Sequence, residues 1–471
     1  MRYISTRGLA PTLGFSDAVL AGLARDGGLY WPERFPVLDK DVIARFAGRS
    51  YQEIAQAVIS PFADDIAPKD LERMIGEAYA GFRHQVVCPV VQTRDNQFVL
   101  ELFHGPTLAF KDVAMQLLGR LMDHILKQRN ERATIVGATS GDTGGAAIEA
   151  FSGLEQVDVF ILYPHGRVSD VQRRQMTTVS APNIHALALE GTFDDCQAHV
   201  KAMFNHHRFR DHYALSGVNS INWARIMAQT VYYFTAAVAL GAPHRAVNFS
   251  VPTGNFGDIL AGFVAKSMGL PIRDLMIATN NNDILARTLQ TGSYTVTGVT
   301  PTSSPSMDIQ VSSNFERLLF EACGRDAERI RQMMGSLAQS GAFTLPEQAM
   351  AAIKRDFSAW KADEDAVAQC MRETLHKTGM VIDPHTAVGV VASNRQLERD
   401  PATPSVVLAT AHPAKFPDAV KKATGLHPAL PPHLADLFER TEHFTVLPND
   451  VKAIEGFIAS HSRIGAQGPS A

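Results

Sequence analysis

From about residue 97 onward, the chain repeats one pattern of apolar and polar positions. A short apolar run ends in a cluster of Gly, Ser, Thr or Asn, and a segment with apolar residues at helical spacing follows. Apolar runs without polar alternation are typical of parallel strands that are buried on both faces. The pattern therefore predicts an α/β fold, with open, mainly parallel sheets and helices on both faces. It is clearest in segments 133–151, 247–270, 275–289 and 405–425.

The first 90 or so residues follow a different pattern. Their apolar residues recur at helical spacing, and Pro61 and Pro68 interrupt the longest of these stretches. We therefore expect a small, mainly helical N-terminal domain over residues 1–92, followed by an α/β region over residues 93–471. The closing segment 464–471 is expected to be a frayed tail.

Composition and charge narrow the possible functions. The chain has 471 residues, and its 44 Lys and Arg against 48 Asp and Glu give a formal net charge of −4 at pH 7. A protein that binds nucleic acid needs an excess of basic residues, so nucleic acid is not an expected partner. The sequence shows no signal peptide and no apolar run of the roughly 20 residues that a membrane crossing needs. We therefore expect a cytoplasmic protein that contacts no membrane, and no obligate protein partner is inferred.

The cysteines and histidines predict no metal site. The four cysteines are far apart in the chain, and neither they nor the histidines show metal-ligand spacing. Isolated thiols of this kind are typical of small apolar side chains packed in a core.

A glycine-containing turn over residues 251–259 is the first candidate for binding chemistry. Gly254 and Gly257 lie three residues apart, between an expected strand and an expected helix. Glycines let backbone N–H groups approach a ligand, and the start of a helix adds unpaired donors and a positive dipole end, which favour a phosphate. No GK[ST] follows, so a nucleoside-triphosphate loop is excluded. A plain strand-to-helix turn is the alternative, and Asp258 would repel a phosphate unless its carboxylate turned back to cap the helix.

A second turn, over residues 137–145, concentrates hydroxyl groups. Thr139, Ser140 and Thr143 can donate hydrogen bonds, as can backbone N–H groups around Gly141. That set of donors suits a carboxylate or a phosphate. The sequence is not GxGxxG, which disfavours a dinucleotide. The alternative is a tight turn whose glycines serve helix–sheet packing.

Lys111 is the third candidate, because it lies where a loop meets a long helix. Apolar residues recur at helical spacing directly after it, over residues 113–126. The helix dipole and desolvation both disfavour an ammonium group there, so we expect a lowered pKa for Lys111. Neutral amines form Schiff bases with carbonyl compounds, and an amine together with a phosphate turn on one sheet edge indicates pyridoxal phosphate. Taken alone, Lys111 would be read as a surface lysine.

Four strings of residues, taken in order, resemble the threonine synthase family. They are HGPTLAFKD, SGDTGG, PTGNFGD and TAHPAKF, and the opening MRYISTRG is similar to the start of the longer members, which have an N-terminal domain. The resemblance covers nearly the whole chain. It implies a pyridoxal-phosphate enzyme of fold type II, similar to the β subunit of tryptophan synthase. It also implies two subdomains, with Lys111 and the loop 137–145 in the first, and the loop 254–258 and Thr410 in the second.

The resemblance implies a role for each matching residue. Lys111 would carry pyridoxal phosphate as a Schiff base, and Thr410 would face the pyridine nitrogen. The remaining residues share the binding of anions: the cofactor phosphate would be held by Gly254, Asn255, Phe256, Gly257 and Asp258, and the α-carboxylate of the substrate by Thr139, Ser140, Gly141 and Thr143.

The implied reaction converts O-phospho-L-homoserine and water to L-threonine and phosphate, the last step of threonine biosynthesis. Lys111 would act as the base in this carbon–oxygen lyase, taking a proton from Cα and then from Cβ, so that phosphate leaves Cγ and water adds at Cβ. The substrate phosphate needs a cation, and Arg225 ranks before Lys415, with His104 as a third candidate. Each of these can instead be a surface or helix-capping cation.

Two other functions remain open from the sequence. A fold-type-II dehydratase or a phospholyase acting on O-phosphothreonine would use the same lysine and phosphate turn, and only product analysis separates them. A catalytically silent binding protein could keep the fold, but the intact Lys111 and phosphate turn argue against it.

Overall fold

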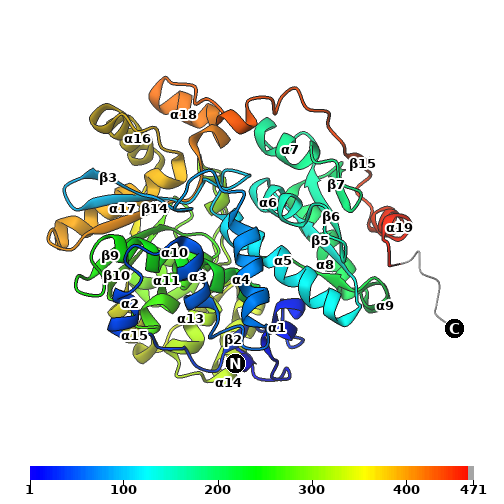
Figure 1. The fold of residues 1–471 in the computed structure, drawn as a ribbon, viewed down its shortest axis with the longest axis horizontal. Coiled ribbons are helices and arrows are strands. Elements are labelled where there is room, and N and C mark those ends of the chain that lie inside the picture. Colours follow the sequence, from blue (N-terminus) through cyan, green and yellow to red (C-terminus); the bar gives the residue numbers. More distant parts are fainter. Residues whose placement is uncertain (465–471) are drawn as a thin grey trace. The chain divides into compact units, whose positions relative to one another are not determined.

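The computed structural model describes residues 1–464, so all but the first residue of the tail expected at 464–471 lies outside the described part. The chain forms two compact units (Figure 1). The first unit contains residues 1–18, 23–114 and 220–428, and the second contains residues 19–22, 115–219 and the described residues from 429 onward. The division predicted from the sequence, at residues 92 and 93, stays a prediction.

A six-stranded sheet forms the centre of the first unit. Neighbouring strands are parallel throughout, except that β3 is antiparallel to β4. Its strands are buried or nearly so at the centre, as the unbroken apolar runs predict. The order across the sheet is β13 (Phe357–Lys361), β10 (Ile272–Thr279), β9 (Val247–Pro252), β14 (Ser405–Ala409), β4 (Gln97–Glu101) and β3 (Val90–Arg94).

Helices cover both faces of this sheet. Met276 packs in one apolar cluster with α16 (Glu364–Thr378) and α17 (Pro384–Arg399). Its neighbour Leu275 reaches to within 2.8 Å of the point where a Cβ on Gly262 of α11 would lie. Successive side chains of a strand point to opposite faces, so α17 and α11 lie on opposite sides of the sheet. The remaining helices and strands that follow β9 in this unit are α11 (Gly257–Ser267), α12 (Ile284–Thr291), β11 (Ser293–Thr295), α13 (Phe315–Ala322), α14 (Ala327–Ser340), β12 (Ala342–Thr344), α15 (Glu347–Asp356) and α18 (Pro417–Thr424).

The N-terminal segment of the first unit is mainly helical. Ser50 and Glu53 form a capping box at the start of α3, and Pro68 occupies the first turn of α4, where its missing N–H group costs nothing. The proline therefore starts a helix here. The elements are β1 (Tyr3–Ser5), α1 (Phe15–Ala21), β2 (Tyr30–Pro32), α2 (Lys40–Ala44), α3 (Tyr51–Ile59) and α4 (Pro68–Tyr79).

The second unit contains an entirely parallel sheet of five strands. All eight residues of its central strand β6 are buried. The order is β15 (Thr445–Leu447), β7 (Ile184–Leu189), β6 (Val157–Pro164), β5 (Ala133–Ala138) and β8 (Leu215–Ser216). The helices that belong to it wholly or mainly are α5 (Lys111–Arg129), α6 (Asp142–Phe151), α7 (Asp170–Thr177), α8 (Phe193–Asn205), α9 (His207–His212) and α19 (Val451–His461).

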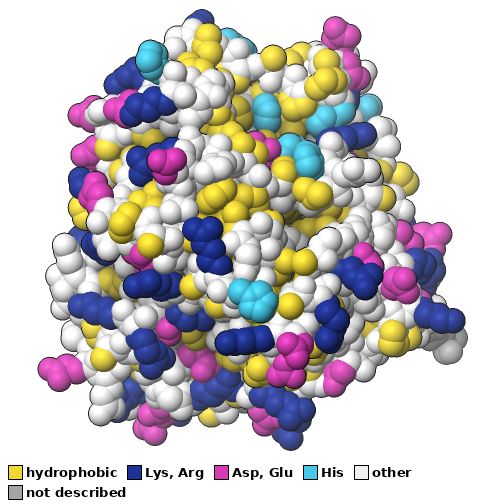
Figure 2. Space-filling model, turned by 60° about the vertical axis from the view of Figure 1, so that its left-hand side comes forward, with side chains coloured by type: hydrophobic (Ala, Val, Ile, Leu, Met, Phe, Trp, Pro, Cys, Tyr) yellow, Lys and Arg dark blue, Asp and Glu magenta, His cyan; other side chains and the backbone are white. Residues whose placement is uncertain are grey.

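The charges on the surface agree with the near-neutral composition. On the face shown in Figure 2, Lys and Arg side chains are interspersed with Asp and Glu side chains. No helix within residues 1–464 is both long enough and apolar enough to cross a bilayer.

Candidate active site

Three adjacent strands of the six-stranded sheet lead into the predicted site of the first unit. β9, β14 and β4 are neighbours and run parallel, so their carboxyl ends lie at one edge. The chain that leaves β9 forms the loop 254–258, the chain that leaves β14 begins with Thr410, and the chain that leaves β4 leads to Lys111. Ligands of open α/β sheets bind beyond this edge.

The backbone next to Lys111 pairs directly with the segment that contains Thr410. The N–H of Phe110 donates to the carbonyl of Thr410 at 2.8 Å, and the N–H of His412 donates to the carbonyl of Leu108 at 3.0 Å. Lys111 is the first residue of α5, as the sequence predicts. These bonds place the lysine and the threonine, which are far apart in the sequence, next to each other.

Two buried charged side chains hold the loop that precedes Lys111. The carboxylate of Asp112 accepts hydrogen bonds from the N–H and the hydroxyl of Thr107, at 2.8 and 2.6 Å. The ammonium group of Lys415 donates to the carbonyl of the same Thr107 at 2.7 Å, and Lys415 is fully buried. Lys415, which the sequence suggests as a ligand of the substrate phosphate, therefore contacts the loop 102–110 before Lys111, named the lysine loop below. His104, the third candidate, pairs with Glu101 at 2.7 Å.

The loop 254–258 has the geometry of an anion-binding turn. Phe256 has a left-handed backbone (φ 64°) immediately before α11, which begins at Gly257. The first four N–H groups of a helix have no partner within it, and the dipole makes this end positive. A Cβ on Gly254 would lie 3.0 Å from the carbonyl oxygen of Ser306, so a side chain at 254 would displace the segment behind the loop.

Residues that sequence analysis missed support this loop from behind. The hydroxyl of Ser312 donates to the carbonyl of Gly254 at 2.6 Å. The side-chain amide and the backbone N–H of Asn314 both donate to the carbonyl of Asn255 at 3.1 Å. The signal in the sequence was weak, since the run SSN before a helix is an ordinary start of a helix.

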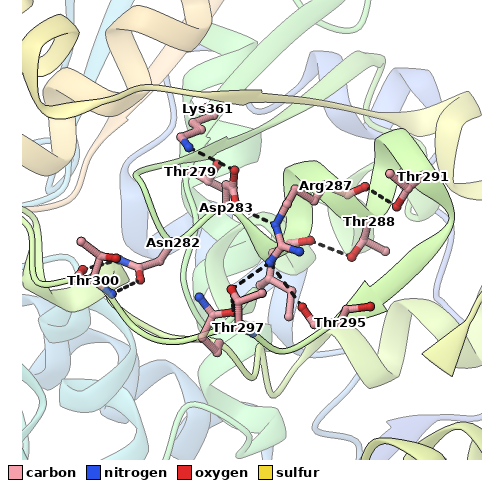
Figure 3. A network of polar contacts seen from close by, with 12 residues as sticks. Thr279, Asn282, Asp283, Arg287, Thr288, Thr291, Thr295, Thr297, Thr300 and Lys361 are labelled. Carbon is pink, nitrogen blue, oxygen red and sulfur yellow. Dashed lines mark hydrogen bonds and ion pairs between the residues drawn. The ribbon is translucent and has the colours of Figure 1, made fainter. Parts of the chain in front are cut away.

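A polar network fixes the segment that contains Ser306. The side-chain amide of Asn282, after β10, donates to the carbonyl of Thr300 at 2.8 Å and accepts from its N–H at 2.9 Å. Figure 3 shows these bonds beside those of Asp283, whose carboxylate pairs with Arg287 at 2.7 Å and with Lys361 at 3.2 Å. The polar residues 280–283 after β10 therefore have a structural role, because they hold the chain that leads to Ser306 in place.

The positive charge of Lys111 acts on Asp258 in this loop. Burial raises the pKa of the Asp258 carboxyl to about 7, and the positive charge of Lys111 opposes the rise. One carboxylate oxygen accepts the N–H of Ile259 at 2.9 Å. The Asp258 carboxylate thus turns back to the backbone of its own helix. We expected it to repel a phosphate unless it did so. Its raised pKa also reduces its negative charge near neutral pH.

Thr410 and Arg225 are also buried in the first unit. Thr410 is 6% exposed, and within residues 1–464 no hydrogen bond to its hydroxyl is found, so this group is available to a ligand. Arg225 lies in the first turn of α10 (Trp223–Ala239) and is 2% exposed. Burial lowers the pKa of its guanidinium to about 10. A bound anion would favour the charged form of such a group.

The hydroxyl-rich loop belongs to the second unit and joins β5 to α6. The hydroxyl oxygen of Thr139 accepts the N–H groups of Gly141 and Gly144, each at 2.9 Å. Gly141 has φ 142°, and a Cβ there would come within 2.4 Å of the amide of Gln172. The loop is therefore held in one conformation that only glycine at 141 permits.

Models of known protein families match most of the chain. Three family models match: one described as "Threonine synthase N terminus" over residues 2–79, one described as "Pyridoxal-phosphate dependent enzyme" over residues 94–357, and one described as "Threonine synthase, C-terminal" over residues 386–458. The fold and the family match define a pyridoxal-phosphate-dependent enzyme of fold type II, which confirms the predicted fold class and cofactor.

Individual relatives are similar over almost their full length. A threonine synthase of Pseudomonas aeruginosa is 52% identical over 99% of both chains. A crystal structure of pyridoxal-phosphate-bound threonine synthase from Brucella melitensis has a TM-score of 0.97 and 62% identity, covering 98% of this chain and 100% of that one. The yeast threonine synthase structure has a TM-score of 0.93 and 39% identity, covering 98% of each chain. The chain belongs to the threonine synthase family.

Proposed function

We propose that the chain makes L-threonine and phosphate from O-phospho-L-homoserine and water, with Lys111 as the residue that bonds to pyridoxal phosphate. One observation carries the assignment of residues. Lys111, Thr410 and the loop 254–258 meet at the edge formed by three adjacent parallel strands, in a chain of the threonine synthase family.

The residues at this edge fit pyridoxal phosphate. The start of α11 and the left-handed Phe256 supply donors for a phosphate, and the lack of a side chain at Gly257 lets a ligand approach the backbone of the first helical residue. The Thr410 hydroxyl can donate to or accept from a ring nitrogen. When bound, the pyridoxal group supplies a carbonyl that condenses with amines and an electron sink for carbanions at Cα and Cβ.

Lys111 moves the protons of the proposed reaction. With the substrate amine in its place, its Nζ would take the proton from Cα, release that proton again, and then take a proton from Cβ, which would let phosphate leave from Cγ. Its backbone is held by the bond from Phe110 to Thr410, and the preceding loop is held by Asp112. A base on such a support changes its distance to the substrate little, which favours proton transfer.

Two sets of residues bind the substrate in our proposal. Thr139, Ser140, Gly141 and Thr143 bind the α-carboxylate of the substrate. Arg225 binds its phosphate, because a buried guanidinium gains most from a dianion that it can contact with two N–H groups. Lys415 stays the second candidate for this phosphate, after Arg225, and its ammonium group also donates to the carbonyl of Thr107 in the lysine loop.

Reduction with borohydride tests the role of Lys111. The wild-type protein loaded with pyridoxal phosphate should become covalently labelled on the peptide that contains Lys111, and Lys111→Ala should lose the label and at least about 100-fold in kcat. Lys421→Ala, at an exposed lysine, is the control. Labelling of another lysine would contradict the assignment. Assay of both threonine and 2-oxobutyrate from phosphohomoserine separates the synthase from a dehydratase.

A further inference from the structure

α10 places one row of side chains against the first turn of α11. Ile226, Gln229 and Tyr233 are spaced by three and four residues, so they share one face of the helix. The Tyr233 hydroxyl donates to the carbonyl of Asp258 at 2.8 Å. A Cβ on Gly257 would lie 3.7 Å from a methyl carbon of Ile226 and 4.0 Å from the side-chain oxygen of Gln229. This row borders the loop 254–258.

Within this row, Gln229 carries a side-chain oxygen that forms no hydrogen bond with the described residues. It is 2% exposed, and its side-chain oxygen has no hydrogen-bond partner among residues 1–464. A buried polar group without a partner is costly, and such groups are rare in folded proteins. Rotation of the carboxamide by 180° exchanges its oxygen for its NH₂ group at almost no steric cost. An anion at the loop would select the orientation that points the NH₂ group toward it.

We propose that the Gln229 carboxamide donates a hydrogen bond to the phosphate of the cofactor bound at Gly254–Asp258. The inference rests on the proposed function, which supplies that phosphate. The loop itself contributes backbone donors but no cationic side chain, and its only ionisable side chain is acidic. A neutral amide donor on the adjoining helix, whose side-chain oxygen would lie 4.0 Å from a Cβ on Gly257, adds a hydrogen bond to the phosphate beside this residue.

The test compares the cofactor with its analogue that lacks the phosphate. Kd values of pyridoxal phosphate and of pyridoxal are measured by absorbance titration of the apoenzyme, for wild type and for Gln229→Leu. We expect the Kd of pyridoxal phosphate to rise about tenfold or more, and the Kd of pyridoxal to stay within about twofold. The apo form of Gln229→Leu should unfold at the same or a higher denaturant concentration than wild type, since a buried unsatisfied group is removed.

A second variant and a control separate this contact from general damage. Gln229→Glu keeps the shape and should weaken pyridoxal phosphate more than Gln229→Leu at pH 8, with partial recovery at pH 6 as the carboxylate is protonated. Gln396→Leu is the control, because Gln396 is equally buried but bonded to Asp274 at 2.7 Å and to Ser405 at 2.6 Å. It should lower stability and leave the ratio of the two Kd values unchanged.

Three results would overturn the inference. They are an unchanged Kd for pyridoxal phosphate in Gln229→Leu, an equal rise for pyridoxal and pyridoxal phosphate, and an effect confined to the KM of phosphohomoserine. The last would assign Gln229 to the phosphate of the substrate. Wild-type protein that binds no pyridoxal phosphate would refute the proposed function as well, and it is recognised before any variant is compared.

Discussion

Asp258 is a carboxyl group placed where a phosphate is proposed to bind, and burial explains how the two can coexist. With a pKa raised to about 7, Asp258 is largely neutral in slightly acidic solution and only partly charged at neutral pH. The hydrogen bond from Ile259 directs one of its oxygen atoms to the backbone of α11. From the sequence we could say only that Asp258 either repels the phosphate or caps the helix, because the string GNFGD carries no information on burial.

The raised pKa of Asp258 makes the stability of the apoenzyme depend on pH. Below pH 4 the carboxyl is protonated in the folded and unfolded states alike. Between about pH 4 and pH 7 only the folded state keeps the proton, so the free energy of unfolding falls as pH rises, by up to about 4 kcal/mol. Asp258→Asn should remove this fall, which urea unfolding at several pH values measures as a difference from wild type.

An exposed carboxyl provides the control for this measurement. Asp95→Asn, on the turn between β3 and β4, should give a stability curve parallel to that of wild type. A curve for Asp258→Asn that is also parallel to wild type between pH 4 and pH 7 would show that Asp258 is ionised in the folded protein across this range.

At the scale of elements, the lysine loop shows how a buried cation can support the chain that leads to Lys111. Lys415 lies in a short 3₁₀ turn after β14 and is fully buried, and its ammonium group donates to Thr107 of the loop before α5. Together with the pairing of Phe110 and Thr410, this bond joins the chain that follows β14 to the chain that follows β4. The sequence string TAHPAKF indicated a cation near Thr410, but which atom it contacts depends on the partner strand.

Lys415→Met should therefore act on turnover more than on substrate binding. Loss of the bond leaves the Thr107 carbonyl buried without its donor and loosens the loop that precedes Lys111. We expect kcat to fall about tenfold or more, with the KM for phosphohomoserine changed by less than about threefold. Steady-state kinetics measures both constants.

Arg225→Met gives the opposite pattern if Arg225 binds the substrate phosphate. Its KM should rise with a smaller change in kcat, and the absorbance spectrum of the bound cofactor should stay as in wild type. A higher KM for Lys415→Met than for Arg225→Met would reverse the order of the two cations proposed above.

At the scale of the molecule, Arg317 links the N-terminal segment to the loop 254–258 within the first unit. It is fully buried and donates to the carbonyl of Tyr30 at 2.7 Å and to the carbonyl of Ile221 at 2.7 Å. It also donates to the side-chain oxygen of Asn314, which in turn bonds to Asn255. The N-terminal segment therefore supports the site through one buried guanidinium.

Arg317→Met should lower both stability and cofactor affinity. Two backbone carbonyls and the Asn314 oxygen would be left buried without donors, which we expect to cost about 3 kcal/mol or more of unfolding free energy. The Kd of pyridoxal phosphate should rise as Asn314 loses its orientation. Urea unfolding and cofactor titration test this, with Arg329→Met, at an exposed arginine, as the control. A loss of stability with unchanged cofactor affinity would limit Arg317 to a structural role.

The sequence predicted the local part of this arrangement and missed the long-range part. Unbroken apolar runs followed by polar turns correctly indicated parallel strands and the turns at Gly254 and Thr410. The order β9–β14–β4 was not predictable, because strand pairing depends on contacts between segments more than 100 residues apart. Ser312 and Asn314 were missed because nothing in their own segment marks them as partners of the loop 254–258.

Because β9, β14 and β4 are neighbours, the sheet fixes the distances between the chain segments that leave them. Parallel neighbours lie roughly 4.8 Å apart, so the chains leaving the two outer strands start about 10 Å from each other whatever side chains they carry. Mutations can then reshape the parts that touch the reacting molecule while the anchor points keep their separation. A fold of this kind can acquire a new substrate preference while the positions that bind the prosthetic group stay unchanged.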